Sequence, residues 1–147
     1  MGIYCPCGVN VNATAQYRFV TFTHYNWPVE GDLTYLADVK ITNLDKSTLS
    51  LNFVDTETPN DHSFTFTANR IASVKCQPFG ACCVITVIGT GLVNGQEYSF
   101  EAVFRDEGRA PGDDSVISFV ITDFFDQNGR TKITSGSIEA IGCQSCS

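Results

Sequence analysis

Basic residues are scarce in this sequence, and their scarcity excludes two classes of partner. Lys and Arg number 9 against 16 Asp and Glu, so the formal net charge is −7. Neutralising nucleic-acid phosphates needs clustered Lys and Arg, and an anionic membrane surface attracts the same residues. The charge balance therefore predicts that the chain binds neither nucleic acid nor a membrane.

The sequence also lacks a long hydrophobic segment. No apolar run approaches the roughly 20 residues that a membrane-spanning helix needs. The segment Met1–Cys7 has neither the basic start nor the apolar stretch of a secretory signal peptide. We nevertheless expect an extracellular or spore-surface protein, because its cysteines indicate an oxidising environment. It leaves the cell by another route, such as lysis of a sporulating mother cell, or its signal peptide has been removed.

Histidine and catalytic signatures are scarce as well. The chain has 2 histidines, His24 and His62, and neither lies in a recognisable nucleophile motif. The patterns G-x-S-x-G and H-E-x-x-H and the phosphate-binding loop do not occur. We therefore predict that the protein is not an enzyme, and that both histidines lie in surface loops or at strand edges.

What the sequence does have is alternation of polar and apolar residues, the pattern of half-buried β-strands. Hydrophobic residues make up 43% of the 147 residues, enough for the core of one domain. No stretch shows the period of about 3.6 residues that marks an amphipathic helix. The predicted strands are Arg18–Thr23, Asp38–Thr42, Ser63–Thr67, Val84–Ile88, Tyr98–Phe104 and Val116–Thr122.

Turn signals rich in Gly and Asn, which tolerate positive φ, separate the predicted strands. The clearest are Glu30–Asp32, Asn94–Gly95, Ala110–Asp114 and Asn128–Gly129. We predict an all-β fold, a single antiparallel β-sandwich of the jelly-roll or Ig-like Greek-key type. Residues 1–15 are predicted to form an extended N-terminal arm, and residues 16–147 the β-sandwich domain with a C-terminal Cys-x-x-Cys tail.

Cysteine stands out by its number. The chain has 7 cysteines, an odd count that leaves at least one thiol outside internal pairing. A leftover cysteine in an oxidised protein indicates an intermolecular bond or a reactive thiol. Cross-linking is predicted at Cys5, Cys7, Cys76, Cys82, Cys83, Cys143 and Cys146.

The placement of the cysteines indicates different partners for different thiols. Cys82 and Cys83 are adjacent where a strand begins, so one thiol is expected to face inward and the other outward. A vicinal disulfide or one buried free thiol is the alternative. Cys5 and Cys7 flank Pro6, which favours an extended segment suited to tether a neighbouring subunit. Alternatively, this segment folds back and pairs with its own domain.

Zinc binding is a second interpretation of the same residue type. Cys143 and Cys146 form a Cys-x-x-Cys tail, the spacing of a redox motif or of half a zinc site. A redox motif needs a βαβ context, which the sequence does not show. Cys5 and Cys7 complete a tetrahedral zinc site with this tail if the termini meet.

Calcium is the other candidate metal ion. Asp123, Asp126 and Asn128 resemble part of a calcium loop, because carboxylate and amide oxygens are ligands that Ca²⁺ prefers. An EF-hand needs a Glu at the end of its loop and two flanking helices, and the sequence predicts neither. The simpler interpretation is a hairpin turn at Asn128–Gly129.

Aromatic residues offer an alternative function. Tyr25, Trp27 and Tyr35 are candidates for a platform on which sugar rings stack, as in carbohydrate-binding β-sandwiches. The alternative is that the aromatic residues fill the core and form cross-strand pairs. A surface glycan is therefore an alternative partner to copies of the chain itself.

In the second half of the sequence, the segments Gly89–Gln96, Tyr98–Phe100, Arg105–Gly108 and Pro111–Asp114 are followed by a strand through Ile121–Asp123 and by Ser135–Ile138. This order resembles a small β-sandwich module of prokaryotic surface proteins. The resemblance covers about residues 63–141 and implies a structural or adhesive sandwich with no catalytic residues to transfer. The cysteines at the chain ends and at residues 76–83 depart from the pattern.

A looser, architectural resemblance is to the disulfide-linked subunits of Bacillus endospore appendages, which are single β-sandwich domains with a cysteine-bearing N-terminal arm. The matching features are Cys5 and Cys7 in the arm and Cys82–Cys83 leading into a strand. The resemblance implies self-assembly through disulfides.

The leading hypothesis is a structural subunit of an extracellular or spore-surface fibre or layer, self-assembling by strand addition and intermolecular disulfides. In its sharpest form, Cys5 or Cys7 of one subunit bonds to Cys82 or Cys83 of another. The alternatives are a secreted carbohydrate-binding module and a zinc-binding structural domain.

Overall fold

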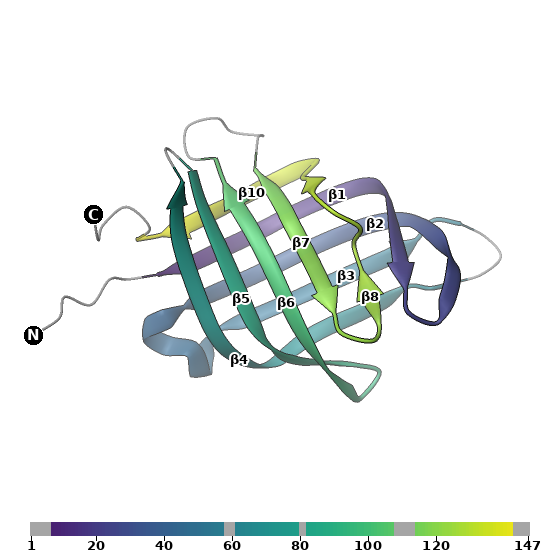
Figure 1. The fold of residues 1–147 in the computed structure, drawn as a ribbon, viewed down its shortest axis with the longest axis horizontal. Coiled ribbons are helices and arrows are strands. Elements are labelled where there is room, and N and C mark those ends of the chain that lie inside the picture. Colours follow the sequence, from purple (N-terminus) through teal and green to yellow (C-terminus); the bar gives the residue numbers. More distant parts are fainter. Residues whose placement is uncertain (1–6, 58–60, 80–81, 108–113, 143–147) are drawn as a thin grey trace, which may run out of the picture.

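The computed structural model describes residues 7–57, 61–79, 82–107 and 114–142 (Figure 1). Its strands are β1 (Gly8–Phe22), β2 (Tyr25–Lys40), β3 (Thr48–Asp55), β4 (Phe64–Phe79), β5 (Cys82–Val93), β6 (Gln96–Asp106), β7 (Ser115–Ile121), β8 (Phe125–Asp126), β9 (Thr131–Lys132) and β10 (Ser135–Ile141). A 3-10 turn, η1 (Ile41–Lys46), joins β2 to β3. The predicted all-β class is confirmed. In the described part of the chain, no helix has the length and hydrophobicity to cross a membrane.

Each strand from β1 to β8 pairs antiparallel with the next one along the chain. β8 also pairs with β1, with Thr21 opposite Asp126 and Phe22 opposite Phe125, so the path of paired strands returns to its start. β10 pairs with the first half of β1. This consecutive order differs from the jelly-roll or Greek-key topology that we expected, because each connection from β1 to β8 joins neighbouring strands.

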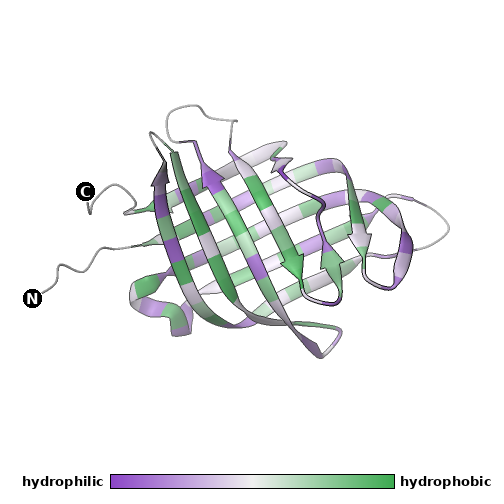
Figure 2. Ribbon diagram, viewed as in Figure 1, coloured by the Kyte–Doolittle hydropathy of each residue, from purple (hydrophilic) through white to green (hydrophobic). Residues whose placement is uncertain are grey.

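The sheet folds over into two layers. Figure 1 shows β4 to β8 crossing in front of β10, β1, β2 and β3. Along most strands the colour alternates between hydrophilic and hydrophobic (Figure 2), which places one set of side chains between the layers. The largest fully buried side chains of this core include Tyr35, Phe53, Phe66, Phe100, Phe104, Phe119 and Phe125.

The start of the chain differs from the predicted arm. Residues 8–15 belong to β1, and every second side chain from Val9 to Ala15 is buried in the core. Small apolar residues fit there because β1 is covered by the front layer while it pairs with β2 and β10. Residues 1–6 of the predicted arm lie outside the described residues.

β2 runs straight through the turn predicted at Glu30–Asp32. Gly31 pairs with Asp55 of β3, and the ring of Phe53 lies where a side chain on Gly31 would be. The glycine therefore permits a close approach of an aromatic ring inside a strand and does not make a turn.

The turns predicted at Asn94–Gly95 and Asn128–Gly129 are confirmed. All of these residues have positive φ, the conformation that tight hairpins require. Asn94–Gly95 joins β5 to β6, and Asn128–Gly129 lies between β8 and β9. The predicted turn at Ala110–Asp114 lies, except for Asp114, outside the described residues.

β4 changes partner along its length. Its first part, Phe64–Thr67, pairs with β3, whereas from Arg70 onward its described pairs are with β5 alone. Register shifts between Ala68 and Arg70 and between Ile71 and Ser73 mark β-bulges, which bend a strand. The second half of β4 is therefore an edge of the front layer (Figure 1).

Tyr35 lies in the core, with 1% of its surface exposed, and is not part of a surface platform. Its hydroxyl donates a hydrogen bond to Oε1 of Gln127 at 2.7 Å, and Gln127 Nε2 donates to the carbonyl oxygens of Val116 and Gly129. Burial raises the pKa of the Tyr35 hydroxyl well above its ordinary value. These bonds satisfy the polar groups that the core encloses.

Candidate functional site at the cysteine-bearing end

The cysteines that the structure describes lie at one end of the molecule. They are Cys7, Cys76, Cys82 and Cys83, whereas Cys5, Cys143 and Cys146 lie outside the described residues. Gly8 pairs with Ile141, so the first and last described strands also meet there (Figure 1). We call this region the cysteine end.

Cys7 and Cys76 form a disulfide bond within the chain. Their Cα atoms lie 5.7 Å apart although 69 positions separate them in the sequence. The bond joins the residue before β1 to the edge half of β4 and so connects the back layer to the front layer. The expectation that Cys7 tethers a neighbouring subunit is therefore wrong, and its alternative, pairing with its own domain, describes Cys7.

Cys82 and Cys83 face opposite sides of β5, as strand alternation predicts. Cys83 is 2% exposed and disulfide-bonded, whereas Cys82 is half-buried and its thiol is free. A vicinal disulfide between them is excluded. Among the described cysteines, Cys82 is the one with a free thiol.

Charged side chains surround the Cys82 thiol. Its Sγ lies 2.6 Å from Oε2 of Glu107 and 3.6 Å from Nη2 of Arg105. Arg105 Nε lies 3.1 Å from Oε1 of Glu107, and Arg130 Nη2 lies 3.7 Å from the same oxygen. The hydrogen bond to Cys82, followed by the charge of Glu107, raises the pKa of the Arg105 guanidinium above its ordinary value.

A cysteine attacks a disulfide as its thiolate, which a neighbouring cation favours and a neighbouring carboxylate opposes. Glu107 accepts a hydrogen bond from the thiol, and Arg105 places a positive charge beside the sulfur. The half-buried position of Cys82 leaves part of its side chain open to a partner.

Sequence patterns did not single out Arg105, Glu107 and Arg130. The pairing of β5 with β6 brings Arg105 opposite Val84, two positions after Cys82. The charged residues that follow the predicted strand Tyr98–Phe104 are the signal that could have identified Arg105 and Glu107. It becomes useful only when that strand is paired with the strand that begins at Cys82. Arg130 follows the Asn128–Gly129 turn, and no local pattern places it here.

Two carboxylates beside this cluster cap the outer side of β10. Asp114 Oδ2 accepts the N–H of Ile138 at 3.0 Å, and Asp106 Oδ2 accepts the N–H of Ala140 at 2.8 Å. Asp114 Oδ1 also accepts the N–H of Glu107 at 2.9 Å. Because these backbone donors are occupied, this stretch of β10 is not a free edge for an added strand.

The predicted zinc site loses one of its ligands. Cys7 is in a disulfide bond, so it is not available to join Cys5, Cys143 and Cys146 around a metal ion. Nor do the described residues contain a group of three or more His, Cys, Asp or Glu side chains that could hold a metal ion.

The calcium candidates have separate roles. Asp126 Oδ1 accepts the N–H of Asn128 at 2.9 Å, and Asn128 Oδ1 accepts the hydroxyl of Thr21 at 2.9 Å. Asp123 lies in the turn between β7 and β8 with positive φ. The Asn128–Gly129 turn therefore accounts for Asp126 and Asn128, and a separate turn holds Asp123.

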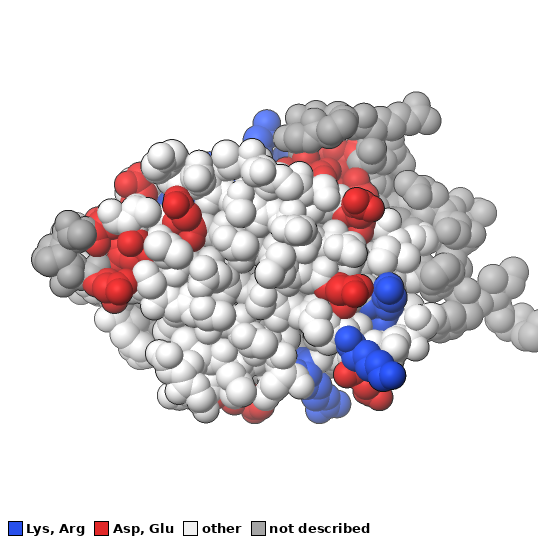
Figure 3. Space-filling model, turned by 180° about the vertical axis from the view of Figure 1, so that it is seen from behind, with Lys and Arg blue, Asp and Glu red and all other residues white. Residues whose placement is uncertain are grey.

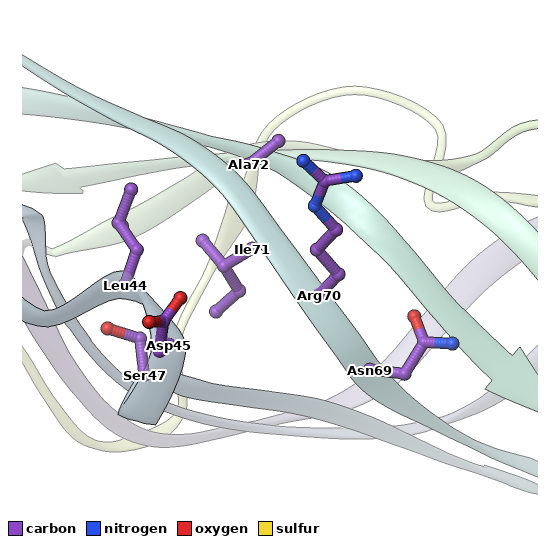
Figure 4. A pocket seen from close by; sticks show the side chains of 7 residues that line it. All are labelled: Leu44, Asp45, Ser47, Asn69, Arg70, Ile71 and Ala72. Atoms are coloured by element: carbon purple, nitrogen blue, oxygen red, sulfur yellow. The ribbon is translucent and has the colours of Figure 1, made fainter.

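A cavity of about 300 Å³ lies at the bend of β4 (Figure 4). Figure 4 shows Asp45 of η1 and Ser47, which follows η1, on one side and Ile71 of β4 on the other. Asn69, at the first bulge, donates to Oε2 of Glu97 at 2.8 Å. None of the residues singled out from the sequence lines this cavity, and we assign it to the geometry of the bend.

The histidines and the remaining aromatic candidates lie at the opposite end, around the hairpin between β1 and β2 (Figure 1). His24 is exposed in the hairpin turn, and His62 is half-buried before β4. Tyr25 is half-buried, and Trp27 is 70% exposed. We call this region the hairpin end.

Comparisons with known proteins identify no relative: no family model, no curated protein and no solved structure matches the chain. The function must therefore be inferred from the geometry of the chain itself.

Proposed function

We propose that the chain is a structural subunit of an extracellular or spore-surface fibre or layer, linked to its neighbours by a disulfide bond at Cys82. The observation that carries this proposal is the free thiol of Cys82, half-buried beside Arg105 and Glu107. Every other described cysteine is already in a disulfide bond. A leftover thiol in an oxidised protein is suited to bond with a neighbour.

A bond between the Cys82 thiols of two copies produces a dimer and then stops, because a symmetric contact closes on itself. A fibre or a layer therefore needs a second contact surface. Two parts of the molecule support such a contact: the outer face of the back layer and the edge half of β4.

The outer face of the back layer has cross-strand rows of uncharged side chains. One row is Ser137, Asn12, Leu36, Ser50 and Thr67, and the next is Ser135, Thr14, Thr34, Asn52 and Thr65. Figure 3 shows the centre of this face without Lys, Arg, Asp or Glu. We call it the uncharged face. Copies of a chain with net charge −7 repel one another, so a face without charges lets them approach at low electrostatic cost.

The edge half of β4 supports strand addition. From Ser73 to Gln77 the described backbone pairs lie on the β5 side, which leaves the other side for the N–H and C=O groups of an added strand. Lys75 is exposed on this edge. Its positive charge suits an acidic partner, such as a second copy of this chain.

The test compares the wild type with Cys82→Ser after air oxidation, on SDS gels run with and without reductant. We expect disulfide-linked species larger than the monomer in the wild type, lost on reduction and absent from Cys82→Ser. Thr86→Ser, a change on the same face of β5, is the matched control and should behave as the wild type. A wild-type protein that stays monomeric, or an unchanged pattern in Cys82→Ser, contradicts the proposal.

Electron microscopy of the same samples separates the covalent bond from the second contact. Leu36→Glu places a charge in the centre of the uncharged face. We expect it to prevent fibres or layers while disulfide-linked dimers still form. Extended assemblies in Leu36→Glu equal to those of the wild type would exclude the uncharged face as the second contact.

A further inference from the structure

The hairpin end contains two cavities side by side. The first, of about 210 Å³, is lined by Phe22, His24, Tyr25, His62 and Phe124. The second, of about 390 Å³, is lined by His24, Gln96, Glu97, Tyr98, Ser99, Thr122 and Asp123. His24 borders both cavities, and we call the two together the hairpin groove.

The two halves of the hairpin groove differ in chemistry. The first half presents aromatic rings, with Tyr25 and His62 4.4 Å apart between ring centroids. The second half presents amide, hydroxyl and carboxylate groups, among them Gln96, Ser99 and Asp123. Tyr98 and Phe124, whose ring centroids lie 5.2 Å apart, join the halves. A ligand that fills the groove therefore has an apolar face at one end and hydrogen-bonding groups at the other.

His62 is held in a fixed orientation at the aromatic half. Its Nδ1 lies 3.1 Å from Oδ2 of Asp55, and its backbone N–H donates to the same oxygen at 2.8 Å. The Asp55 side chain is 1% exposed, so the carboxylate of this pair is shielded from water. A carboxylate partner makes Nδ1 the donor nitrogen and leaves Nε2 for a different partner.

We propose that the hairpin groove binds a pyranose ring of a neutral glycan. The apolar C–H face of a pyranose stacks on aromatic rings, and its hydroxyl groups bond to amides, carboxylates and hydroxyls. No Lys or Arg is among the lining residues of either cavity, whereas Glu97 and Asp123 are. Uronic acids and phosphorylated sugars are therefore repelled, and neutral sugars are not.

This site is separate from the proposed assembly function. The hairpin groove lies at the end opposite Cys82 (Figure 1), and none of its lining residues belongs to the uncharged face. A polymer joined at the cysteine end would leave the hairpin ends free to contact a glycan. Of the sugar platform predicted from the sequence, Tyr25 lines the groove, whereas Tyr35 is buried elsewhere.

A quaternary ammonium ligand is the competing chemistry, since it also binds aromatic faces and carboxylates. Such a cation needs rings and carboxylates around the same point. Here Glu97 and Asp123 line the polar cavity with the single ring of Tyr98 and the imidazole of His24, whereas Phe22, Tyr25 and Phe124 line the other. This separation favours a sugar, and tetramethylammonium serves as the competing probe in the experiment.

Histidine-selective NMR gives a direct readout, because the 2 histidines of the chain both line the hairpin groove. The probes are cellohexaose, chitohexaose, maltohexaose, mannohexaose and xylohexaose, with hexagalacturonate as the acidic control. We expect saturable shifts of both histidine signals with at least one neutral oligosaccharide, and none with hexagalacturonate. Shifts with none of the neutral sugars, or with tetramethylammonium alone, would overturn the proposal.

Matched variants locate the binding. Tyr25→Ala should weaken binding by about ten-fold, because a stacking ring is lost. Tyr17→Ala removes a tyrosine that is 70% exposed outside the groove and should leave binding unchanged. Asp123→Asn keeps a residue that tolerates positive φ and should alter binding without unfolding the turn. Equal losses of binding affinity in Tyr25→Ala and Tyr17→Ala would exclude the hairpin groove as the binding site. Cys82→Ser should bind as the wild type does, which separates this proposal from the assembly.

Discussion

The two ends of the molecule are held together by different interactions. At the hairpin end, β8 pairs with β1 through the backbone, and Phe22 packs against five neighbouring rings. At the cysteine end, β4 and β1 are joined by the Cys7–Cys76 bond, and carboxylates occupy the outer donors of β10. Where backbone pairing between the layers is incomplete, side chains and a disulfide bond take its place.

This difference bears on the proposed functions. A covalently closed end tolerates a free thiol and contact with a neighbour, because its integrity does not depend on a continuous ladder. An end closed by packed rings already has the rigid aromatic surfaces that a sugar ring needs. Three predictions test whether the two ends are held as independently as the structure indicates.

The largest effect is expected from removing the Cys7–Cys76 disulfide bond. The double variant Cys7→Ser/Cys76→Ser should lower the free energy of unfolding by about 4 kcal/mol, since a 69-residue separation is no longer constrained in the unfolded chain. Urea unfolding measures the loss, and hydrogen exchange should show it first in β4 and the start of β1. Cys82→Ser is the control, with an expected change below about 0.5 kcal/mol. Equal loss of protection at the hairpin end would show that the ends are coupled.

The second effect is expected at the opposite end. Phe22→Ala removes a ring that lies 5.5 to 5.8 Å from its five partners, and should cost about 3 kcal/mol. Phe19→Ala is the matched control on the same strand, because Phe19 is 56% exposed. Thermal or urea unfolding measures the loss in the free energy of unfolding for each variant. Equal losses for the two variants would contradict the role of the aromatic cluster.

The smallest effect concerns Tyr35, in the core between the ends. Its pKa is raised in the folded state, so the unfolded chain loses the hydroxyl proton first as the pH rises through about 10. The stabilisation is complete below that pH and declines above it, by about 1.4 kcal/mol per pH unit. Urea unfolding at pH 8 to 11 should show this decline in the wild type relative to Tyr35→Phe. If the free energy of unfolding depends on pH in the same way in the wild type and in Tyr35→Phe, the contribution of Tyr35 is excluded.

The sequence contains more of the fold than the predicted strands include. The alternation of Val9, Val11, Ala13 and Ala15 has the same period as the predicted strands, but its small side chains resemble those of an arm. The same period recurs in Thr48–Asp55, where Leu49, Leu51 and Phe53 are buried, although this segment is not among the predicted strands. Gly31 resembles a turn residue in the sequence, because the Phe53 ring that requires a glycine there comes from a different strand.

The candidate site was predictable only where a local rule applies. Strand alternation was enough to separate the environments of Cys82 and Cys83. The pairing of Cys7 with Cys76 was not predictable, because many connectivities satisfy seven cysteines and the choice depends on how β4 bends. Arg130 reaches Glu107 through tertiary packing alone, and the burial of Tyr35 depends on its partner Gln127.

The pairing of Gly8 with Ile141 has a mechanical consequence. A pulling force applied through β1 and β10 at these residues would act across the ladder, opening its hydrogen bonds one pair at a time as a zipper does. The Cys7–Cys76 bond lies at the head of that zipper and anchors β1 to a different strand. Tension applied at Cys7 would therefore pass in part into β4 through a covalent bond, and only the remainder would act on the hydrogen bonds between Gly8 and Ile141.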